Sequence, residues 1–352
     1  MKHVRLILLV FCLFSTSLFA QQIPLVSFFT YNWTLINPAA IPREAIELRQ
    51  VSTLVNLNCR YQQHIVVSEA PQIYDLRYEH VFANDDKVGA FLNSESDGII
   101  RNQSVSANFA KFVSLQFDTN NPNGLLDFGN ILFGLTTTYR LLSIDAGNVT
   151  WNNPSLLATT FNQKHLDLSF GAFWFYRPIR EEKEKWSDQF KQEYSPDPYG
   201  YIGVSNIQAI QLGYSNYYRE ASQWNGLAGI VYHRWELSTW VRNVPNIAFV
   251  NDNGKTTPIS TDLNLRYYYR KKGSDEKDRT IGNGLWFGAG VSSAKTVSLE
   301  CGVRYWPDSE HQRGINLYYI QMGLAYSGFS FSSQPITQPS MIELNVSVNF
   351  AK

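Results

Sequence analysis

The side chains best able to do chemistry are scattered along this sequence rather than gathered into a motif. Beyond residue 20 the histidines stand far apart, at His64, His80, His165, His233 and His311. Isolated positions of this kind lack the spacing with which histidine, cysteine and carboxylate groups hold a metal ion. His80 falls on the apolar side of an alternating run, and His233 stands beside Trp235. We therefore expect both to belong to an aromatic surface, and we predict no metal site.

One short run places two acids and a base where they would share a face. Asp75, Arg77 and Glu79 alternate with apolar residues, so in an extended chain all three point to the same side. A catalytic cluster is one interpretation, and a layer of ion pairs inside a β-structure is the more common one. The sequence has no G-x-S-x-G motif, no phosphate-binding P-loop and no paired Cys/His spacing. We expect no enzyme and no cofactor.

The elements that carry these residues alternate with a period of two. Between residues 342 and 350, apolar side chains alternate with Glu343, Asn345, Ser347 and Asn349. Residues 73–82 and 259–270 alternate in the same way. A β-strand turns successive side chains to opposite faces, so each run predicts a strand with one apolar and one polar surface.

About fourteen runs of this kind follow one another along the chain. They cover residues 51–61, 73–82, 88–93, 105–117, 131–144, 166–176, 201–212, 224–235, 236–244, 259–270, 285–293, 297–306, 315–326 and 342–350. Many approach the ~9–11 residues that a tilted transmembrane strand needs. Turn-forming clusters separate several of them, at residues 84–86, 94–98, 120–124 and 251–254.

Two all-β architectures fit this pattern, a large soluble β protein and a membrane barrel. The polar faces include Gly288, Gly290 and Gly302, which suits a narrow lumen, and the apolar faces repeatedly end in aromatic residues. Aromatic residues make up 14% of the chain, as expected for the aromatic girdles of a membrane barrel. We predict an all-β fold, a transmembrane antiparallel β-barrel of about fourteen strands with an N-terminal strap or plug segment.

The first twenty residues are predicted to be a signal peptide. Lys2, His3 and Arg5 precede an apolar stretch, and small residues lead to Ala20, after which we expect cleavage. The apolar stretch is shorter than the ~20 residues of a spanning helix. We expect three parts: a signal peptide at 1–20, an N-terminal strap at 21–44 and an outer-membrane barrel at 45–352.

The last strand carries a pattern typical of barrel assembly. Outer-membrane barrels commonly end on an aromatic residue preceded by apolar residues at alternating positions. Leu344, Val346, Val348 and Phe350 fit that pattern, although Ala351 and Lys352 follow the aromatic residue. We expect these four residues to act in barrel assembly.

Residues 21–39 resemble the start of the PorP/SprF family of type IX secretion and gliding proteins. That family begins with QQDPQFSQYMFN followed by LLINPAYAG; the corresponding residues here are Gln21, Gln22, Pro24, Ser27, Asn32 and Leu35 to Ala39. Ile23, Phe28 and the pair Ile41-Pro42 depart from it. Further similarities lie at residues 201–205, 260–264 and 342–344. The resemblance implies a role in type IX secretion or gliding and an outer-membrane location.

Residues 21–44 themselves alternate poorly and contain Pro24, Pro38 and Pro42. Proline cannot complete a strand ladder, so this segment is not expected to cross lipid. It either packs as a plug or strap against the lumen or the periplasmic rim, or it contacts a partner. We assign Gln22, Pro24, Asn32, Asn37, Pro38 and Ala39 as the family motif and candidate partner contacts.

We expect a non-enzymatic outer-membrane barrel that anchors or docks partners. Those partners are outer-membrane lipid, proteins of the secretion or gliding machinery, and a cognate secreted surface protein. The alternative is an outer-membrane channel for a small solute or lipid. Two charged stretches, residues 177–199 and 270–279, are solvated loops or docking surfaces. The chain has 30 basic and 30 acidic residues, so nothing in its bulk charge favours nucleic acid.

Overall fold

The computed structural model describes fourteen stretches of the chain and Phe29. These parts are residues 32–48, 52–63, 72–97, 100–116, 127–144, 161–176, 198–213, 222–232, 234–243, 259–270, 284–292, 296–305, 317–330 and 340–351, together with Phe29. The predicted signal peptide, Gln22, Pro24, nearly all of 177–199 and the turn clusters at 120–124 and 251–254 lie outside the described residues. Within the described residues, no helix is both long and apolar enough to span a membrane.

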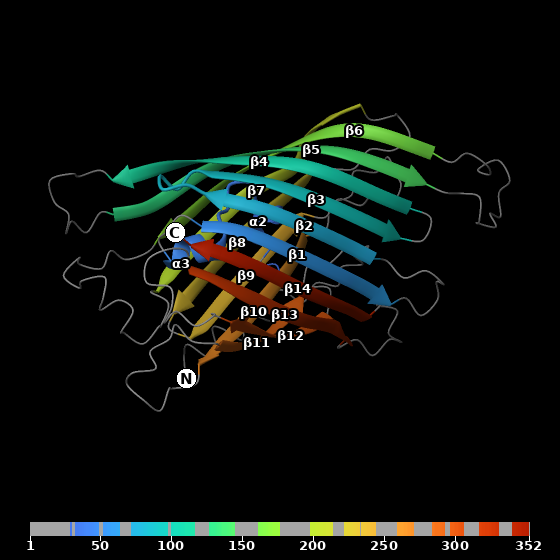
Figure 1. Cartoon of the computed structure of the whole chain (residues 1–352). Coiled ribbons are helices and arrows are strands. Elements are labelled where there is room, and N and C mark those ends of the chain that lie inside the picture. Colours follow the sequence, from blue (N-terminus) through green and yellow to red (C-terminus); the bar gives the residue numbers. More distant parts are fainter. Residues whose placement is uncertain are drawn as a thin grey trace.

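Fourteen antiparallel strands form one closed barrel (Figure 1). Each strand pairs with its neighbours in sequence, and β1 closes the sheet against β14. The strands are β1 (Ser52–Gln63), β2 (Gln72–Val81), β3 (Lys87–Asp97), β4 (Ile100–Gln116), β5 (Asp127–Ile144), β6 (Phe161–Tyr176), β7 (Tyr199–Leu212), β8 (Gln223–Tyr232), β9 (Trp235–Asn243), β10 (Ile259–Arg270), β11 (Gly284–Ser292), β12 (Thr296–Tyr305), β13 (Leu317–Ser330) and β14 (Ser340–Ala351). Full closure leaves the sheet without free edges along its paired length.

The fourteen alternating runs of the sequence correspond one to one to these strands. Several boundaries differ from the prediction; β6, for example, begins at Phe161 rather than Leu166. β3 continues to Asp97 through the predicted turn at 94–98, β4 begins at Ile100 rather than Val105, and Trp235 opens β9 instead of closing β8. Ser94 and Ser96 pair with Gln103 and Arg101 across β3 and β4. Polar residues such as Ser94 and Ser96 are also typical of turns, and the sequence alone does not show that they pair with a neighbouring strand.

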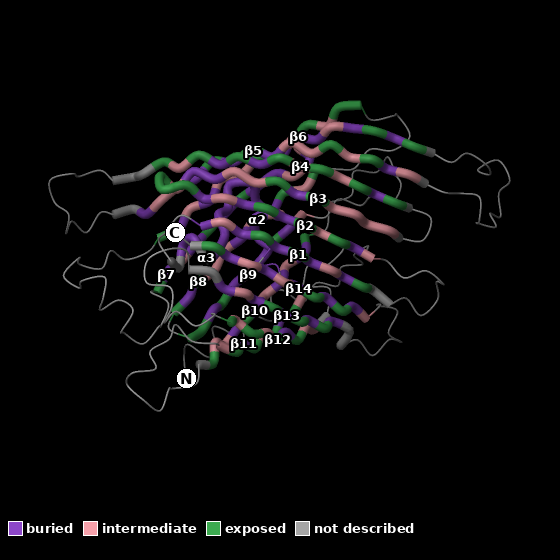
Figure 2. Tube along the Cα trace, in the orientation of Figure 1, coloured by how far each residue is buried: buried purple, intermediate pink, exposed green. Residues whose placement is uncertain are grey.

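Exposed and buried residues alternate along the strands (Figure 2). The exposed positions form a mainly apolar outer face, and many of the buried, inward positions are polar. In β14, Leu344 and Phe350 are 46% and 44% exposed on the outer face, whereas Glu343 and Asn345 are buried. Gly288, Gly290 and Gly302 lie on the inner face, where Gly288 faces Arg266 and Glu300 and Gly302 faces Trp286. The outer face is thus the surface that apolar surroundings would cover.

The two ends of the barrel are distinct. At the end that we call the terminal end, β1 begins and β14 ends, with Ser52 beside Ala351 and Val81. The opposite end is called the far end. The wall is tallest at β4 to β6, of 17, 18 and 16 residues, and lower at β9 and β11, of 9 residues each (Figure 1). Cys59 and Cys301 are free thiols on separate strands.

Candidate functional site

Two short helices lie inside the terminal end of the barrel. We call Phe29 and residues 32–48 the plug; it contains α2 (Trp33–Ile36) and α3 (Arg43–Leu48) (Figure 1). Its apolar side chains join the largest cluster of buried residues in the described structure. The wall contributes residues from β2 and from β4 to β9, most of them toward the terminal end: Val81, Ala110, Leu132, Phe173, Phe175, Tyr199, Tyr201, Leu227, Val231 and Trp240.

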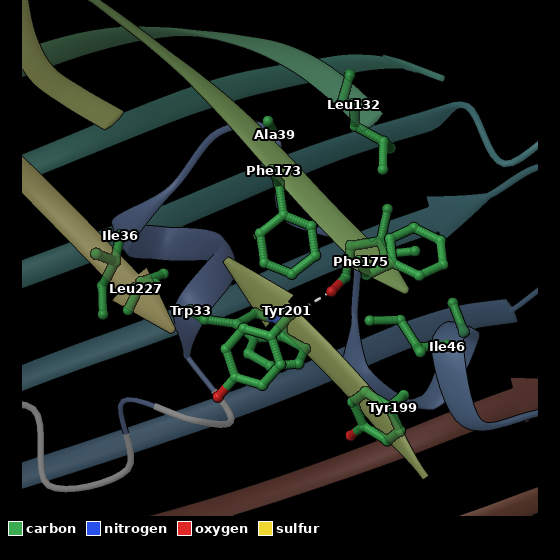
Figure 3. Close-up of a cluster of buried hydrophobic side chains, with 14 of the residues drawn as sticks. Trp33, Ile36, Ala39, Ile46, Leu132, Phe173, Phe175, Tyr199, Tyr201 and Leu227 are labelled. Atoms are coloured by element: carbon green, nitrogen blue, oxygen red, sulfur yellow. Dashed lines mark hydrogen bonds between the residues drawn. The ribbon is translucent and has the colours of Figure 1, made fainter. Parts of the chain in front are cut away.

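Trp33 lies at the centre of this cluster (Figure 3). Its ring centroid is 4.5 Å from that of Tyr201 in an edge contact and 5.6 Å from that of Phe173. The Trp33 indole Nε1 donates a hydrogen bond of 2.7 Å to the carbonyl of Ile41. This bond folds the plug back on itself, and a buried indole requires such an acceptor.

The predicted motif residues Asn37, Pro38 and Ala39 lie on the barrel wall, against a flat area that we call the glycine seat. The seat consists of Gly134, Gly171 and Gly203, on the adjacent strands β5, β6 and β7. A side chain at Gly134 would collide with Pro38 and Ala39, and one at Gly171 or Gly203 would collide with the Asn37 carboxamide. Only glycine lets the plug backbone approach the wall this closely.

The Asn37 side chain connects the plug to two strands at once. Its Nδ2 donates hydrogen bonds to the carbonyls of Ala172 on β6 and Val204 on β7, at 2.9 and 3.3 Å. Its Oδ1 accepts a hydrogen bond of 2.9 Å from the Ala39 amide, which fixes the turn at Pro38. Position 37 needs a side chain that donates to the wall carbonyls and accepts from the Ala39 amide at the same time, and the asparagine carboxamide does both.

Wall side chains supply the hydrogen bonds that the plug backbone lacks, because the plug pairs with no strand. Asn108 Nδ2 donates to the Pro38 carbonyl at 2.9 Å, and Ser205 Oγ donates to the Ile36 carbonyl at 2.7 Å. The Lys87 ammonium donates to the carbonyl of Ala40. Buried backbone carbonyls are therefore satisfied without a ladder, as burial requires.

Two groups of charged residues hold the plug in place. Arg43 of α3 pairs with Glu236 on β9, and its guanidinium also contacts the Tyr268 hydroxyl on β10. On the opposite strands, Glu79 lies 3.4 Å from Lys87 and 3.5 Å from Arg77. Thr34 joins this second group, accepting a hydrogen bond of 2.6 Å from Arg77 and donating one of 3.1 Å to Glu79. Buried charges are tolerated only when they are paired in this way.

Asp86 links the turn after β2 to the tall strand β4. Its carboxylate accepts hydrogen bonds from Lys111 Nζ at 2.7 Å and from the Phe112 amide at 2.9 Å. Burial raises the pKa of the Asp86 carboxyl, but these hydrogen bonds and the Lys111 charge outweigh burial and hold the pKa below its usual range. The Phe112 side chain packs against the buried cluster that contains the plug. The hydrogen bond from the Phe112 amide to Asp86 therefore helps to hold the wall of that cluster in place.

The remaining predicted chemical groups fall into structural positions. Arg77 and Glu79 face the lumen as an ion pair, as the layer interpretation predicts. His80 contacts the Phe82 ring at 4.6 Å on the outer face, and His165 lies in the lumen 3.8 Å from Asp167. Among the described residues no three His, Cys, Asp or Glu side chains are placed to hold a metal ion. His64, His233 and His311 lie outside the described residues.

The motif residues are thus divided between the plug and the part of the chain before it. Asn32, Asn37, Pro38 and Ala39 are buried, and the Asn32 side chain has no hydrogen-bond partner in the described structure. The assignment of the motif to partner contact stays a prediction. Leu344, Val346, Val348 and Phe350 all lie on the outer face of β14, and their role in assembly also stays a prediction.

Sequence reasoning missed Arg43 and the glycine seat. Arg43 directly follows Pro42 and is the first charged residue after the predicted signal peptide, which was the available signal. Its partner Glu236 is 193 residues away, so the pair depends on closure of the barrel. Gly134, Gly171 and Gly203 occupy inward positions of three adjacent strands. A glycine inside a strand often marks a place where another backbone approaches closely.

The sequence was compared with models of protein families, and one model matches nearly the whole chain. It describes the type IX secretion system membrane protein PorP/SprF and matches residues 18–328. The chain belongs to this family. The PorP/SprF barrel described above is therefore an outer-membrane protein of a secretion system, and it works with proteins of that machinery. None of the curated proteins matches the sequence.

Solved structures of other barrels align with this PorP/SprF chain at low identity. The Pseudomonas putida toluene transporter TodX is 10% identical, with 91% of this chain and 93% of that one covered and a TM-score of 0.43. A Pseudomonas aeruginosa FadL homologue is 8% identical, with coverages of 90% and 92% and a TM-score of 0.43. CdiB from Acinetobacter baumannii is 8% identical with a TM-score of 0.41. The alignment covers 85% of this chain but only 60% of CdiB.

Proposed function

We propose that this PorP/SprF protein is a non-enzymatic docking barrel, which anchors secreted and periplasmic partners of the type IX secretion or gliding apparatus to the outer membrane. The observation that carries the proposal is the plug. Its apolar core and paired charges occupy the terminal end of the lumen, where a solute channel would need open space. A closed barrel offers its ends and connections as binding surfaces instead.

The lumen beyond the plug supports the same proposal. Arg266 Nη2 lies 2.6 Å from Glu300 Oε2, and Asn264 donates a hydrogen bond of 2.7 Å to the same carboxylate. Asn56 and Asn345 hydrogen-bond each other at 3.1 Å, and all of these side chains are buried. Inward side chains of a water-filled channel stay hydrated, whereas these are paired with one another.

The long charged connections supply the docking surface. The connection between β6 and β7 and the connection between β10 and β11 both leave the terminal end, because β6 and β10 end there. Residues 180–185 read Arg-Glu-Glu-Lys-Glu-Lys. Periplasmic turns of barrels are usually short. If the mature N-terminus is periplasmic, as is normal for bacterial barrels, these two long connections face the periplasm and meet machinery proteins there.

The start of the mature chain adds a second contact. Gln22 and Pro24 of the family motif precede the plug in sequence by only a few residues. We assign Gln22 and Pro24 to partner contact. We assign Asn32, Asn37, Pro38 and Ala39 to the plug, which anchors the segment that carries Gln22 and Pro24. The connections at the far end, between β5 and β6 and between β9 and β10, are the candidate contacts for a secreted surface protein.

Site-specific photo-crosslinking in native membranes tests the proposal. A photoreactive amino acid at Glu184, in the β6–β7 connection, is expected to capture a type IX secretion component, identified by mass spectrometry. The matched control carries the same amino acid at Asn251, in the β9–β10 connection, and is expected not to capture that component. Equal capture from both positions, or capture from neither, contradicts docking at the terminal end.

A further inference from the structure

The outer face of the barrel carries very few charges, and they are unevenly placed. Among strand residues whose side chains the structure describes, the charged ones exposed on the outer face are Arg101, Lys111 and Lys164, all basic. A charge facing hydrocarbon is destabilising in a depth-dependent way. Long basic side chains are tolerated where they reach the headgroup region. Each of the three therefore marks a headgroup level.

Lys111 differs from the other two in having a protein partner. It lies toward the terminal end of β4, and its Nζ is 2.7 Å from the Asp86 carboxylate. Arg101 on β4 and Lys164 on β6 lie toward the far end, and neither forms an ion pair with any residue in the described parts of the chain. Two basic side chains that form no ion pair among the described residues thus share one region of the outer wall.

A groove of about 220 Å³ lies in the same region of the wall, across β3, β4 and β5. Its lining includes four apolar side chains on the outer face, together with Ser94 and Gln103. The apolar four are Leu92, Val105, Tyr139 and Leu141, and each is between 38% and 56% exposed. A pocket with this lining accepts a hydrocarbon chain.

The strand register places the basic residues along the far-end rim of this groove. Leu92, Val105 and Tyr139 are cross-strand partners and form one row. The next outward row toward the far end contains Ser94, Gln103, Leu141 and Lys164. The row beyond it begins with Ser96 and Arg101. Toward the far end, the apolar row is therefore followed by the amide of Gln103 and by the cations Lys164 and Arg101.

We propose that this groove binds a phosphorylated glycolipid of the outer leaflet. One acyl chain lies against Leu92, Val105 and Tyr139, and the phosphate is held by Arg101 and Lys164, with Gln103 donating a hydrogen bond. The choice of leaflet rests on the proposed function, which turns the terminal end to the periplasm; the groove lies toward the far end, where β3 ends and β4 begins. Phosphate is the headgroup chemistry that a pair of exposed cations recognises.

Binding of diphosphoryl lipid A to the full-length protein in detergent tests this inference, with native mass spectrometry as the measurement. Wild type is expected to retain one lipid A per barrel in a saturable manner. The double variant Arg101→Gln/Lys164→Gln is expected to lose at least tenfold in affinity. The matched control Lys111→Gln removes a basic side chain of the same outer wall and is expected to bind as wild type does.

Competing ligands separate the possible sources of the phosphate and of the acyl contact. Inorganic phosphate is expected not to displace lipid A, because it has no acyl chain for the apolar row. Phosphatidylethanolamine is expected not to displace it either, because its ammonium group leaves the headgroup without the net negative charge that Arg101 and Lys164 attract. The inference is overturned if the double variant binds as wild type does, or if inorganic phosphate displaces lipid A. Preference for phosphatidylglycerol over lipid A also overturns it, since that result assigns the groove to the inner leaflet. Heat-modifiable migration of each variant shows that the barrel is folded.

Discussion

At the scale of single residues, the plug is held by close approach and by paired charges. Glycine is required at the seat because Asn37 and the Pro38–Ala39 peptide occupy the space of a side chain. The family motif was recognisable from sequence as Asn37-Pro38-Ala39. Its physical role was not, because the role depends on glycines about 100 to 170 residues further along the chain, which closure of the barrel brings beside it.

The glycine seat gives a direct prediction. In Gly171→Ala the added methyl group overlaps the Asn37 carboxamide, so we expect destabilisation of about 1–3 kcal/mol, the usual range for overpacking. The measurement is the temperature at which the heat-modifiable band unfolds in a mild detergent gel. Gly226→Ala is the control, because a methyl group there meets only ordinary contacts near 3.8 Å. Equal unfolding temperatures for the two variants would show that the seat does not hold the plug.

Asp86 predicts a pH dependence at the terminal end. Its pKa is lowered in the folded protein, so its contribution is present above the unfolded pKa of about 4 and is lost as the pH falls through the folded value. Because Lys111 is 57% exposed, the contribution is about 1 kcal/mol or less. Asp86→Asn should therefore lower the unfolding temperature at pH 7 but not at pH 2. A variant that matches wild type at both pH values contradicts this role.

At the scale of elements, the period of two identified every strand of the barrel. The alternation is reliable because each strand has one face against the lumen and one against apolar surroundings. What the pattern did not determine was length. β3 and β4 continue past the apolar rows through Ser94, Ser96 and Arg101, which are polar because they lie toward the far end rather than because the chain turns. The prolines of residues 21–44 predicted that this segment stays out of the sheet, and packing against the lumen was one of the expected positions. The two helices and the glycine seat were not deducible from sequence.

The last strand carries a prediction about assembly. Phe350→Ala removes the terminal aromatic side chain from the outer face of β14, beside Thr53 and Tyr318. We expect less folded barrel in the outer membrane, because Phe350 ends the apolar row of Leu344, Val346 and Val348. Phe82→Ala is the matched control, since Phe82 is an outward aromatic residue, 42% exposed, beyond the end of β2 at the same terminal end. Equal losses in both variants would assign the effect to the aromatic girdle and not to the last strand.

At the scale of the whole molecule, the plug of Phe29 and residues 32–48 lies at one end of the barrel, the terminal end, which we call the plugged end. The long connection 177–197 and the connection 271–283 leave the plugged end. The cell compartment that this end faces can be measured directly. In a Cys59→Ser/Cys301→Ser background, Ser187→Cys and Ser274→Cys are expected to react with an impermeant thiol reagent only after the outer membrane is permeabilised. Ready labelling of both on intact cells would place the plugged end at the cell surface.

The central claim is that this barrel binds partners and does not conduct solutes. Single-channel recording of the purified full-length protein in planar lipid bilayers tests it most directly, with an open porin as the control for insertion and flotation with liposomes as the control for incorporation. Because the plug occupies the terminal end and lumen charges such as Arg266 and Glu300 are paired, we predict no steady ion conductance from the incorporated protein. A stable, ohmic open-pore current would contradict the account and favour a channel.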